Sequence, residues 1–343
     1  MAPLVVIVGE TASGKSALAM QIAEYISAAA ASRLESVSVR DREAQANRTN
    51  GTVQRASKGH KPEMAKKTAE SSALPMSKLA DLEGAEIICA DSWTVYRGFD
   101  IGTAKPSNDE CRQVPHHLLD IADPPGGFSA AEFKSRAMTA IVDITNRGKL
   151  PILVGGTGLY IDSVIFNYGF LPPGEPKERE TLSALSIEDL LQIIQTADVD
   201  IAGIDVRNKR RLIRLIETKG RRPAKANLRS NTLIIGLNSS KDNIQQRVAT
   251  RVDTMLASGL EQEVRNLAKR YGWGVEPMKG IGYREFKDYF AGQQTLEQTR
   301  ERIIRSTFQL GKKQRTWFKR NKSIQWLTNS QQALPIVQNF LSK

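Results

Sequence analysis

The feature that most constrains this chain is a glycine-rich loop close to its N-terminus. The apolar, β-branched run at residues 4–8 is typical of a buried parallel strand. The motif G-x-x-x-x-G-K-S follows at once, and residues 17–26 then carry apolar side chains at helical spacing. Strand, loop and helix in this order predict a Walker A phosphate-binding loop. Its residues are Gly9, Glu10, Thr11, Ala12, Ser13, Gly14, Lys15 and Ser16.

The residue types of this loop match the chemistry of an anion site. Gly9 and Gly14 permit backbone angles that a Cβ would forbid, so the loop amides can turn inward around a phosphate. The following helix adds partial positive charge at its N-terminus. Lys15 supplies a point charge, and the Ser16 hydroxyl is a candidate ligand for Mg²⁺. The loop by itself leaves open whether it binds a nucleoside triphosphate or another diphosphate.

Composition sets limits on the class of protein. The 343 residues are 40% hydrophobic, which is enough for a large core and more than one compact unit. No apolar run reaches the length of a bilayer span and the first residues lack a charged leader, so we expect a soluble, cytoplasmic protein. The two cysteines, Cys89 and Cys111, form no C-x-x-C pair, which argues against disulfides or a thiolate zinc site.

The formal charge of +12 indicates an anionic partner. Basic residues crowd residues 207–229 and 300–322, with few acids between them and with Trp317, Phe318 and Trp326 close to the second stretch. Solvated helix faces would also explain such runs. The aromatic neighbours favour a surface that binds a polyanion.

The predicted fold class is α/β, a P-loop NTPase-like parallel sheet with flanking helices, a small helical insertion domain and a helical C-terminal region. Residues 28–84 are rich in Ala, Ser, Lys and Glu and contain no aromatic residue, so we expect a low-complexity insertion that is largely disordered or loosely helical. A basic arm on RNA is the alternative. The expected division is 1–27 with 85–174 as the core, 28–84 as this insertion, 175–206 as a small helical insertion, 207–240 as a return to the core, and 241–343 as the helical C-terminal region.

Two further predicted strands end in polar residues. Asp91 follows the strand at residues 86–90, and Thr157 follows the strand at residues 150–154 within G-G-T-G. Ligands of open α/β sheets bind at the carboxyl ends of the strands, so both side chains should lie beside the Walker loop. Asp91 would then be either a catalytic group or a Walker B carboxylate that steadies Mg²⁺. Adjacent residues point apart, so His116 and His117 are not expected to bind one metal ion.

Other segments carry weaker signals. The loop at residues 93–106 is dense in Tyr, Asp, Thr and Lys and is expected to face a substrate. Ser129 and Glu132 form a candidate capping box for a helix over residues 130–146. Further helices are predicted at 207–218, 241–257, 260–271, 283–291 and 295–320, and further strands at 232–237 and 324–327.

Seven motifs, taken in their order along the chain, together resemble those of the tRNA dimethylallyltransferases, also called tRNA isopentenyltransferases. They occupy residues 9–16, 90–92, 96–106, 115–120, 154–160, 211–214 and 280–284. The most specific is D-I-G-T-A-K-P at residues 100–106, together with V-G-G-T at 154–157. The resemblance covers nearly the whole chain except residues 28–84.

The resemblance implies a reaction. A dimethylallyl group would pass from dimethylallyl diphosphate to N6 of the adenosine 3′ of the anticodon, in tRNAs that read codons starting with U. The Walker loop would hold the diphosphate, with Mg²⁺ on Ser16 and a contact from Arg214. The catalytic candidates are Asp91, which would accept the N6 proton, with Lys15 and Thr157.

The same resemblance implies that the partner is tRNA, gripped at its anticodon stem-loop, with residues 175–206 as a tRNA-binding insertion. A membrane partner is not expected, and we expect a monomer. The implied tRNA contacts are Asp91, Ser92, Trp93, Thr94, Thr157, Arg179, Arg210, Arg211, Arg214, Lys279, Gly280, Ile281, Gly282, Tyr283 and Arg284.

The sequence departs from the family pattern at several positions. Glu10 stands where proline is common and adds a negative charge beside the diphosphate, while Thr94 and Arg210 each replace a common glutamine. The zinc finger of eukaryotic members is not found, which predicts a bacterial-type enzyme. The alternatives are an ATP-dependent P-loop phosphotransferase, an adenylate isopentenyltransferase that modifies free nucleotides, and an RNA-binding ATPase switch without transfer chemistry.

Overall fold

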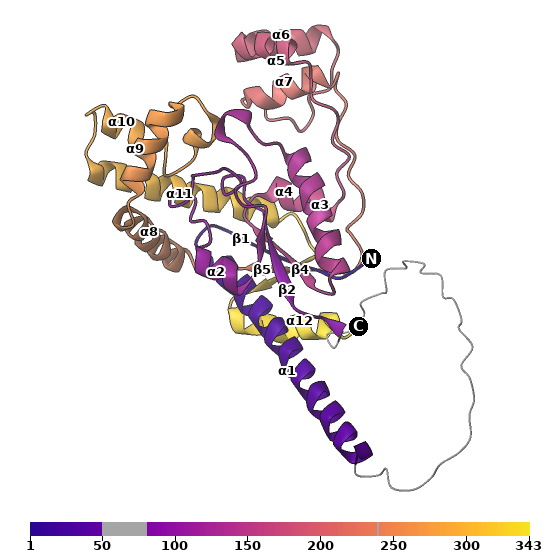
Figure 1. Cartoon of the computed structure of the whole chain (residues 1–343). Coiled ribbons are helices and arrows are strands. Elements are labelled where there is room, and N and C mark those ends of the chain that lie inside the picture. Colours follow the sequence, from indigo (N-terminus) through magenta and orange to yellow (C-terminus); the bar gives the residue numbers. More distant parts are fainter. Residues whose placement is uncertain (50–80, 239) are drawn as a thin grey trace. The chain divides into compact units, whose positions relative to one another are not determined.

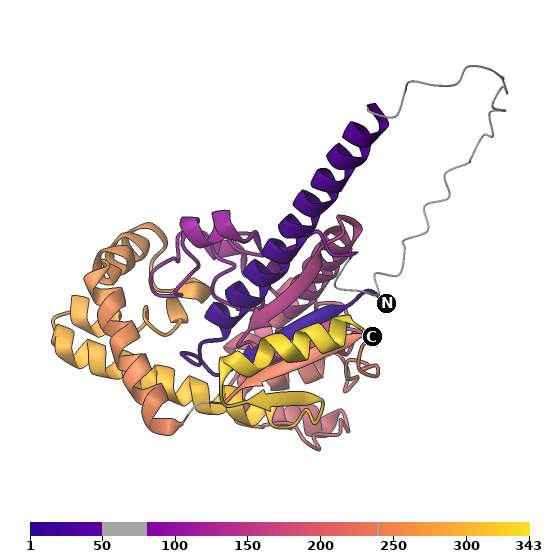
Figure 2. The same cartoon turned by 90° about the horizontal axis from the view of Figure 1, so that it is seen from below.

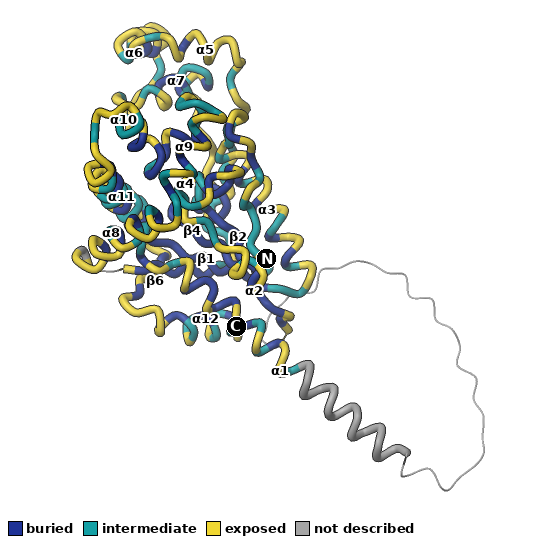
Figure 3. The backbone as a smooth tube through the Cα atoms, turned by 60° about the vertical axis from the view of Figure 1, so that its left-hand side comes forward, coloured by how far each residue is buried: buried dark blue, intermediate teal, exposed yellow. Residues whose placement is uncertain are grey.

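A six-stranded parallel sheet in the order β3-β2-β4-β1-β5-β6 forms the centre of the computed structural model, which describes residues 1–49, 81–238 and 240–343 (Figure 1). The strands are β1 Leu4–Gly9, β2 Ala85–Cys89, β3 His116–His117, β4 Leu150–Gly155, β5 Thr232–Leu237 and β6 Ile324–Leu327. Every neighbouring pair is parallel. The central strands are buried along their length (Figure 3), as their continuous apolar runs predict. The predicted α/β fold is therefore confirmed.

Helices flank the sheet on both sides. Those outside residues 162–228 are α1 Lys15–Thr49, α2 Asn108–Gln113, α3 Ala130–Asn146, α4 Gly158–Ile165 (which runs into that segment), α8 Lys241–Ala257, α9 Leu260–Tyr271, α10 Phe286–Phe290, α11 Leu296–Phe318 and α12 Ala333–Leu341. Helix α3 begins at the predicted capping box, because Ser129 accepts from the Glu132 amide while the Glu132 side chain accepts from the Ser129 amide. Helices α2 and α12 and the short strand β3 were not predicted. The apolar positions of α12, Ala333, Val337 and Leu341, are all buried.

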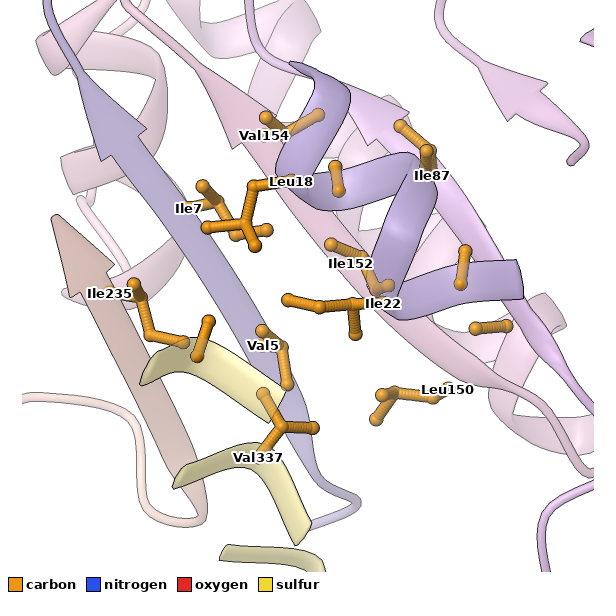
Figure 4. Close-up of a cluster of buried hydrophobic side chains, with 14 of the residues drawn as sticks. Val5, Ile7, Leu18, Ile22, Ile87, Leu150, Ile152, Val154, Ile235 and Val337 are labelled. Carbon is orange, nitrogen blue, oxygen red and sulfur yellow. The ribbon is translucent and has the colours of Figure 1, made fainter. Parts of the chain in front are cut away.

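The main core lies between the sheet and the two helices α1 and α12. Leu18 and Ile22 of α1 pack on Ile7 and Ile152, and α12 covers the neighbouring part of the sheet beside β5 (Figures 2 and 4). Side chains alternate along a strand, so the intervening residues point to the opposite face, where α3 contacts β2 and β4. This packing fixes the carboxyl end of β1, from which the Walker loop emerges.

Helix α1 is longer than predicted. It continues through Thr49, so the first part of the expected insertion 28–84 is helical, and Ala30 is still buried. The physical reason is the alanine run at residues 28–31, because alanine has the highest helix propensity even where aromatic residues are lacking. The prediction of disorder for residues 50–80 lies outside the described residues. Within the described residues, no helix is both long and apolar enough to cross a membrane.

Residues 162–228 form a second compact unit, apart from the unit of residues 1–161 and 229–343. Its helices are α5 Pro176–Ala184, α6 Ile187–Thr196 and α7 Lys209–Glu217, which pack together (Figure 1). Leu190 and Ile194 of α6 meet Leu212 and Leu215 of α7 in a separate core. The unit extends beyond the predicted insertion 175–206 and includes the basic helix, whose apolar side packs on α6.

Candidate active site

The Walker loop joins β1 to α1 and takes the backbone conformation that its glycines allow. Gly14 has φ +93°, and Ala12 adopts a left-handed φ of +61° although it is not glycine. A Cβ on Gly9 would lie 2.7 Å from Ser13 Oγ, so only glycine fits at the end of the strand. The Ser13 amide donates to the Glu10 carbonyl at 3.2 Å and closes the turn.

Asp91 and Thr157 lie together at the ends of β2 and β4, as predicted. The Thr157 hydroxyl accepts from the Ser92 amide at 3.1 Å, and the Thr157 amide donates to the Ala90 carbonyl at 3.3 Å. The two chains approach so closely here that a Cβ on Gly155 would lie 2.0 Å from the Ala90 carbonyl oxygen. Asp91 Oδ1 accepts from the Trp93 amide at 2.9 Å. The backbone of its own loop therefore orients the Asp91 carboxylate.

A small cleft with a cavity volume of about 80 Å³ borders this group. Thr11 of the Walker loop, Asp91, Trp93 and Arg251 contribute its polar side. The remaining lining residues are Gly102, Thr103, Val248, Val252, Met255, Ile281, Gly282, Ile303, Thr307 and Leu310. The cleft therefore combines one carboxylate, Asp91, and one cationic group, Arg251, with an apolar wall.

Lys15 of the Walker loop and Arg251 of α8 are two cations whose pKa values are lowered beside the loop. Burial and the nearby Arg251 guanidinium lower the pKa of Lys15 to about 8, while Asp91 and Glu10 act in the opposite direction. Burial also lowers the pKa of Arg251, and Asp91 opposes that effect. Arg251 lies on α8 and was not predicted. The only sequence signal for it is an arginine beside apolar residues of α8, and that signal does not say which cleft the helix lines.

Glu263 joins two of the predicted substrate-binding loops. Its Oε2 accepts from the amides of Asp100 at 3.1 Å and Ile101 at 2.8 Å, and its Oε1 accepts from the Gly102 amide at 3.0 Å and the Tyr283 hydroxyl at 2.7 Å. A Cβ on Gly102 would lie 2.5 Å from the Tyr283 ring, so the loops are in direct contact. Glu263 was not predicted as a site residue.

The loop at residues 93–106 faces the cleft only in part. Gly102 and Thr103 line the cleft. Lys105 does not, because its ammonium group is buried and donates to Asp100 at 2.5 Å and Asp120 at 2.6 Å. Lys105 therefore holds the loop together, and it lines a second pocket with Asp100 and Pro106. The expectation that this loop faces a substrate stays a prediction.

The predicted RNA-binding residues outside residues 162–228 fall into two groups. Those at least partly exposed are Asp91, Ser92, Trp93, Thr157, Lys279, Ile281 and Arg284. The others, Thr94, Gly280, Gly282 and Tyr283, are buried. The Thr94 hydroxyl has no hydrogen-bond partner within the described residues, and the Tyr283 side chain packs in the core. Tyr283 as a whole is buried, so the structure does not expose it to RNA, and its predicted contact stays a prediction.

Within residues 162–228, Arg179 and Arg214 share one buried partner. Arg179 binds both oxygens of Glu217 at 2.6 and 2.7 Å, and Arg214 donates to Glu217 at 3.2 Å and to the Leu171 carbonyl at 2.7 Å. Arg210 and Arg211 are exposed on α7. The contacts of these arginines with diphosphate and tRNA stay predictions.

Ser16 could take part in binding a metal ion. Its side chain is exposed on the first turn of α1, where the phosphates of a ligand would lie. The described part of the chain holds no group of three or more His, Cys, Asp or Glu side chains suited to a metal. Mg²⁺ usually takes one or two protein ligands together with phosphate oxygens and water, so this site fits it. The histidines have separate partners: His117 contacts Glu86 at 2.7 Å, and His116 contacts the Val114 carbonyl at 2.7 Å.

Fold and cleft together define an α/β protein with the Walker A sequence at the carboxyl end of its parallel sheet, beside the cleft. A family model described as IPP transferase matches residues 94–321. The tRNA dimethylallyltransferase of Anoxybacillus flavithermus is 39% identical over 260 residues, which cover 73% of this chain and 84% of that protein. The Bacillus subtilis enzyme of the same name is 38% identical over 264 residues, with coverage of 73% and 84%. This chain belongs to the IPP transferase family, which confirms the resemblance in its motifs.

Solved structures agree with this assignment. The full-length tRNA isopentenylpyrophosphate transferase from Bacillus halodurans has a TM-score of 0.64 and 29% identity, and the match covers 100% of this chain and 96% of that one. A eukaryotic dimethylallyltransferase acting on tRNA has a TM-score of 0.70 at 23% identity, with coverage of 100% and 80%, and shares the fold.

Proposed function

We propose that this protein transfers the dimethylallyl group of dimethylallyl diphosphate to N6 of the adenosine 3′ of the anticodon, in tRNAs that read codons starting with U. Diphosphate is the second product. The observation that carries the proposal is one cleft bordered by the Walker loop, Asp91 and an apolar wall, in a chain of the IPP transferase family. Family relatives carry the name tRNA dimethylallyltransferase, which favours an RNA acceptor over free nucleotides and over phosphotransfer.

The cations of the site would bind and stabilise the leaving diphosphate. Its negative charge grows as the allylic carbon–oxygen bond breaks, and preorganised donors act most strongly at that stage. With a pKa of about 8, Lys15 is mostly protonated at neutral pH, and Arg251 adds a second, partly buried cation. Mg²⁺ held by Ser16 and the phosphates would supply further charge neutralisation.

Asp91 would act on the nucleophile. The exocyclic nitrogen forms a bond to the allylic carbon as the carbon–oxygen bond breaks, and it must lose a proton. Asp91 is the carboxylate in the cleft lining and is held in place by the Trp93 amide, so it is the group that would accept this proton. Thr157 positions the same loop through Ser92. Apolar residues such as Val252 and Met255 would exclude water from the reacting carbon.

The adenosine must leave its stack to enter the cleft. Ile281 and Gly282 line the cleft, and Lys279 and Arg284 are exposed on the same loop, where they could meet the RNA backbone. The basic helix α7 would supply further contacts to the anticodon stem, as the family resemblance implies. We also propose that the protein acts on tRNA in the cytoplasm and as a monomer.

The decisive experiment is mass spectrometry of tRNA nucleosides after incubation of unmodified tRNA with the protein and dimethylallyl diphosphate. We expect a dimethylallyl adenosine in tRNA and no product from AMP. Asp91→Asn should lower the rate by about 10²–10⁴ because the general base is lost, while tRNA binding is retained. ATP consumption without allyl transfer would favour a phosphotransferase, and full activity of Asp91→Asn would remove Asp91 from the mechanism.

A further inference from the structure

Helix α11 touches the Walker loop at three points, although the two segments lie about 300 positions apart in the sequence. Arg315 Nη2 binds the two carboxylate oxygens of Glu10 at 2.6 and 2.8 Å, over a separation of 305 positions. The Thr11 amide donates to Gln314 Oε1 at 2.8 Å. A Cβ on Gly311 would lie 3.1 Å from Glu10 Oε2. Positions 311, 314 and 315 lie on one side of the helix, and that side meets the loop.

These contacts hold the groups that would meet the diphosphate. The Glu10 carbonyl accepts from Lys15 Nζ at 3.3 Å, so the residue whose side chain binds Arg315 also orients the lysine through its backbone. Gln314 Nε2 donates to the Gly156 carbonyl at 3.1 Å. Helix α11 thus contacts both the Walker loop and the loop that carries Thr157.

Glu10 is an unusual residue for this position because it places a negative charge in an anion-binding loop. Its side chain is 3% exposed, and a buried carboxylate requires a partner. The charge is close enough to influence the protonation of Lys15. Arg315 is the partner that the fold supplies. Without Arg315, the carboxylate would compete with the diphosphate for Lys15.

We propose that Arg315 is a positioning residue for the Walker loop. It neutralises the charge of Glu10 and holds this carboxylate against helix α11. Lys15 and the loop amides then remain available to the diphosphate. From the sequence, we expect the Glu10 carboxylate to lie beside the diphosphate. In this proposal, Arg315 holds the carboxylate away from the diphosphate. The identity of the diphosphate ligand rests on the proposed function, whereas the contact itself does not.

Calorimetric titration of the full chain with inorganic diphosphate and Mg²⁺ tests the proposal, with steady-state prenylation of tRNA beside it. Arg315→Gln should weaken diphosphate binding and raise the KM for dimethylallyl diphosphate by about tenfold, with a small effect on kcat. Glu10→Gln/Arg315→Gln should return both values to within about threefold of the wild type, because no unpaired carboxylate remains. Arg300→Gln is the matched control, since Arg300 lies on the same helix but pairs with Asp253 and Glu297.

Two results would overturn the proposal. One is wild-type diphosphate affinity in Arg315→Gln. The other is a double variant that binds as weakly as Arg315→Gln, which would mean that Arg315 acts on the ligand directly or only through stability. If Arg315→Gln does not fold, Arg315→Lys takes its place: it keeps the charge and should bind diphosphate within about threefold of the wild type. A wild-type protein that binds diphosphate but does not prenylate tRNA would refute the proposed function and leave these binding tests valid.

Discussion

Substitution of Glu263 tests how the loop at residues 100–102 is held in place beside the cleft. Its carboxylate accepts four hydrogen bonds, three from consecutive amides at residues 100–102 and one from the Tyr283 hydroxyl. Glu263→Gln keeps the size of the side chain but replaces one oxygen with an NH₂ group. Each oxygen of the carboxylate accepts two of the four bonds. An NH₂ group in place of Oε2 faces two amide donors and loses two bonds, whereas an NH₂ group in place of Oε1 loses only the Gly102 bond, because the Tyr283 hydroxyl can rotate and accept.

The magnitude follows from the bond that is lost in the better orientation of the amide. A hydrogen bond to a charged group contributes about 1.5–3 kcal/mol, and the remaining bonds weaken because the charge is gone. Glu263 is partly exposed and water can replace part of the loss, so we expect the free energy of unfolding to fall by about 2 kcal/mol. At about 2–4 °C for each kcal/mol, Tm should fall by about 4–8 °C. Gly102 and Thr103 line the cleft, so kcat/KM should fall about ten- to a hundredfold.

Thermal unfolding and steady-state prenylation of tRNA measure the two effects. Glu261→Gln is the matched control, because Glu261 lies on the same helix and pairs with Arg265 at 2.7 Å where both side chains are partly exposed. Such a pair contributes up to about 1 kcal/mol, so this variant should behave nearly as the wild type. Wild-type Tm and kcat/KM in Glu263→Gln would refute the role assigned to Glu263.

Three further predictions concern single residues. Lys15 has a lowered pKa, so it keeps its charge below about pH 8 and loses it above; affinity for inorganic diphosphate, measured by titration, should therefore fall as the pH rises through 8. Contacts with three basic side chains hold the pKa of Glu86 far below its usual range, so its contribution to stability is present above about pH 4.5 and is lost in acid. Glu86→Gln should lower the free energy of unfolding by about 1.5–3 kcal/mol at pH 7 and flatten that acid dependence in denaturant titrations. Gly155→Ala should shift the Ala90 backbone and lower both stability and transfer rate, whereas Gly126→Ala, with open space around it, should leave the transfer rate unchanged.

Local sequence patterns were sufficient to predict most strands of the sheet and some residues of the site. Residues 232–237 and 324–327 form the predicted strands, and 241–257 and 260–271 form the predicted helices, because period and end signals agree there. Asp91 and Thr157 could be located because a parallel sheet gathers its strand ends at one edge. Helix α12 lacks a capping side chain at its start and was missed.

The sequence by itself determined the phosphate-binding loop, the parallel sheet and the carboxylate beside them. Each of these depends on residues that are close together in the chain or on a general rule of sheet topology. Only the tertiary structure decided which distant side chains complete the site. Arg251 and Glu263 come from helices α8 and α9, and Arg315 reaches Glu10 from 305 positions away. The reason is physical: the direction of a side chain across such a distance depends on how helices pack, and no local pattern encodes that packing.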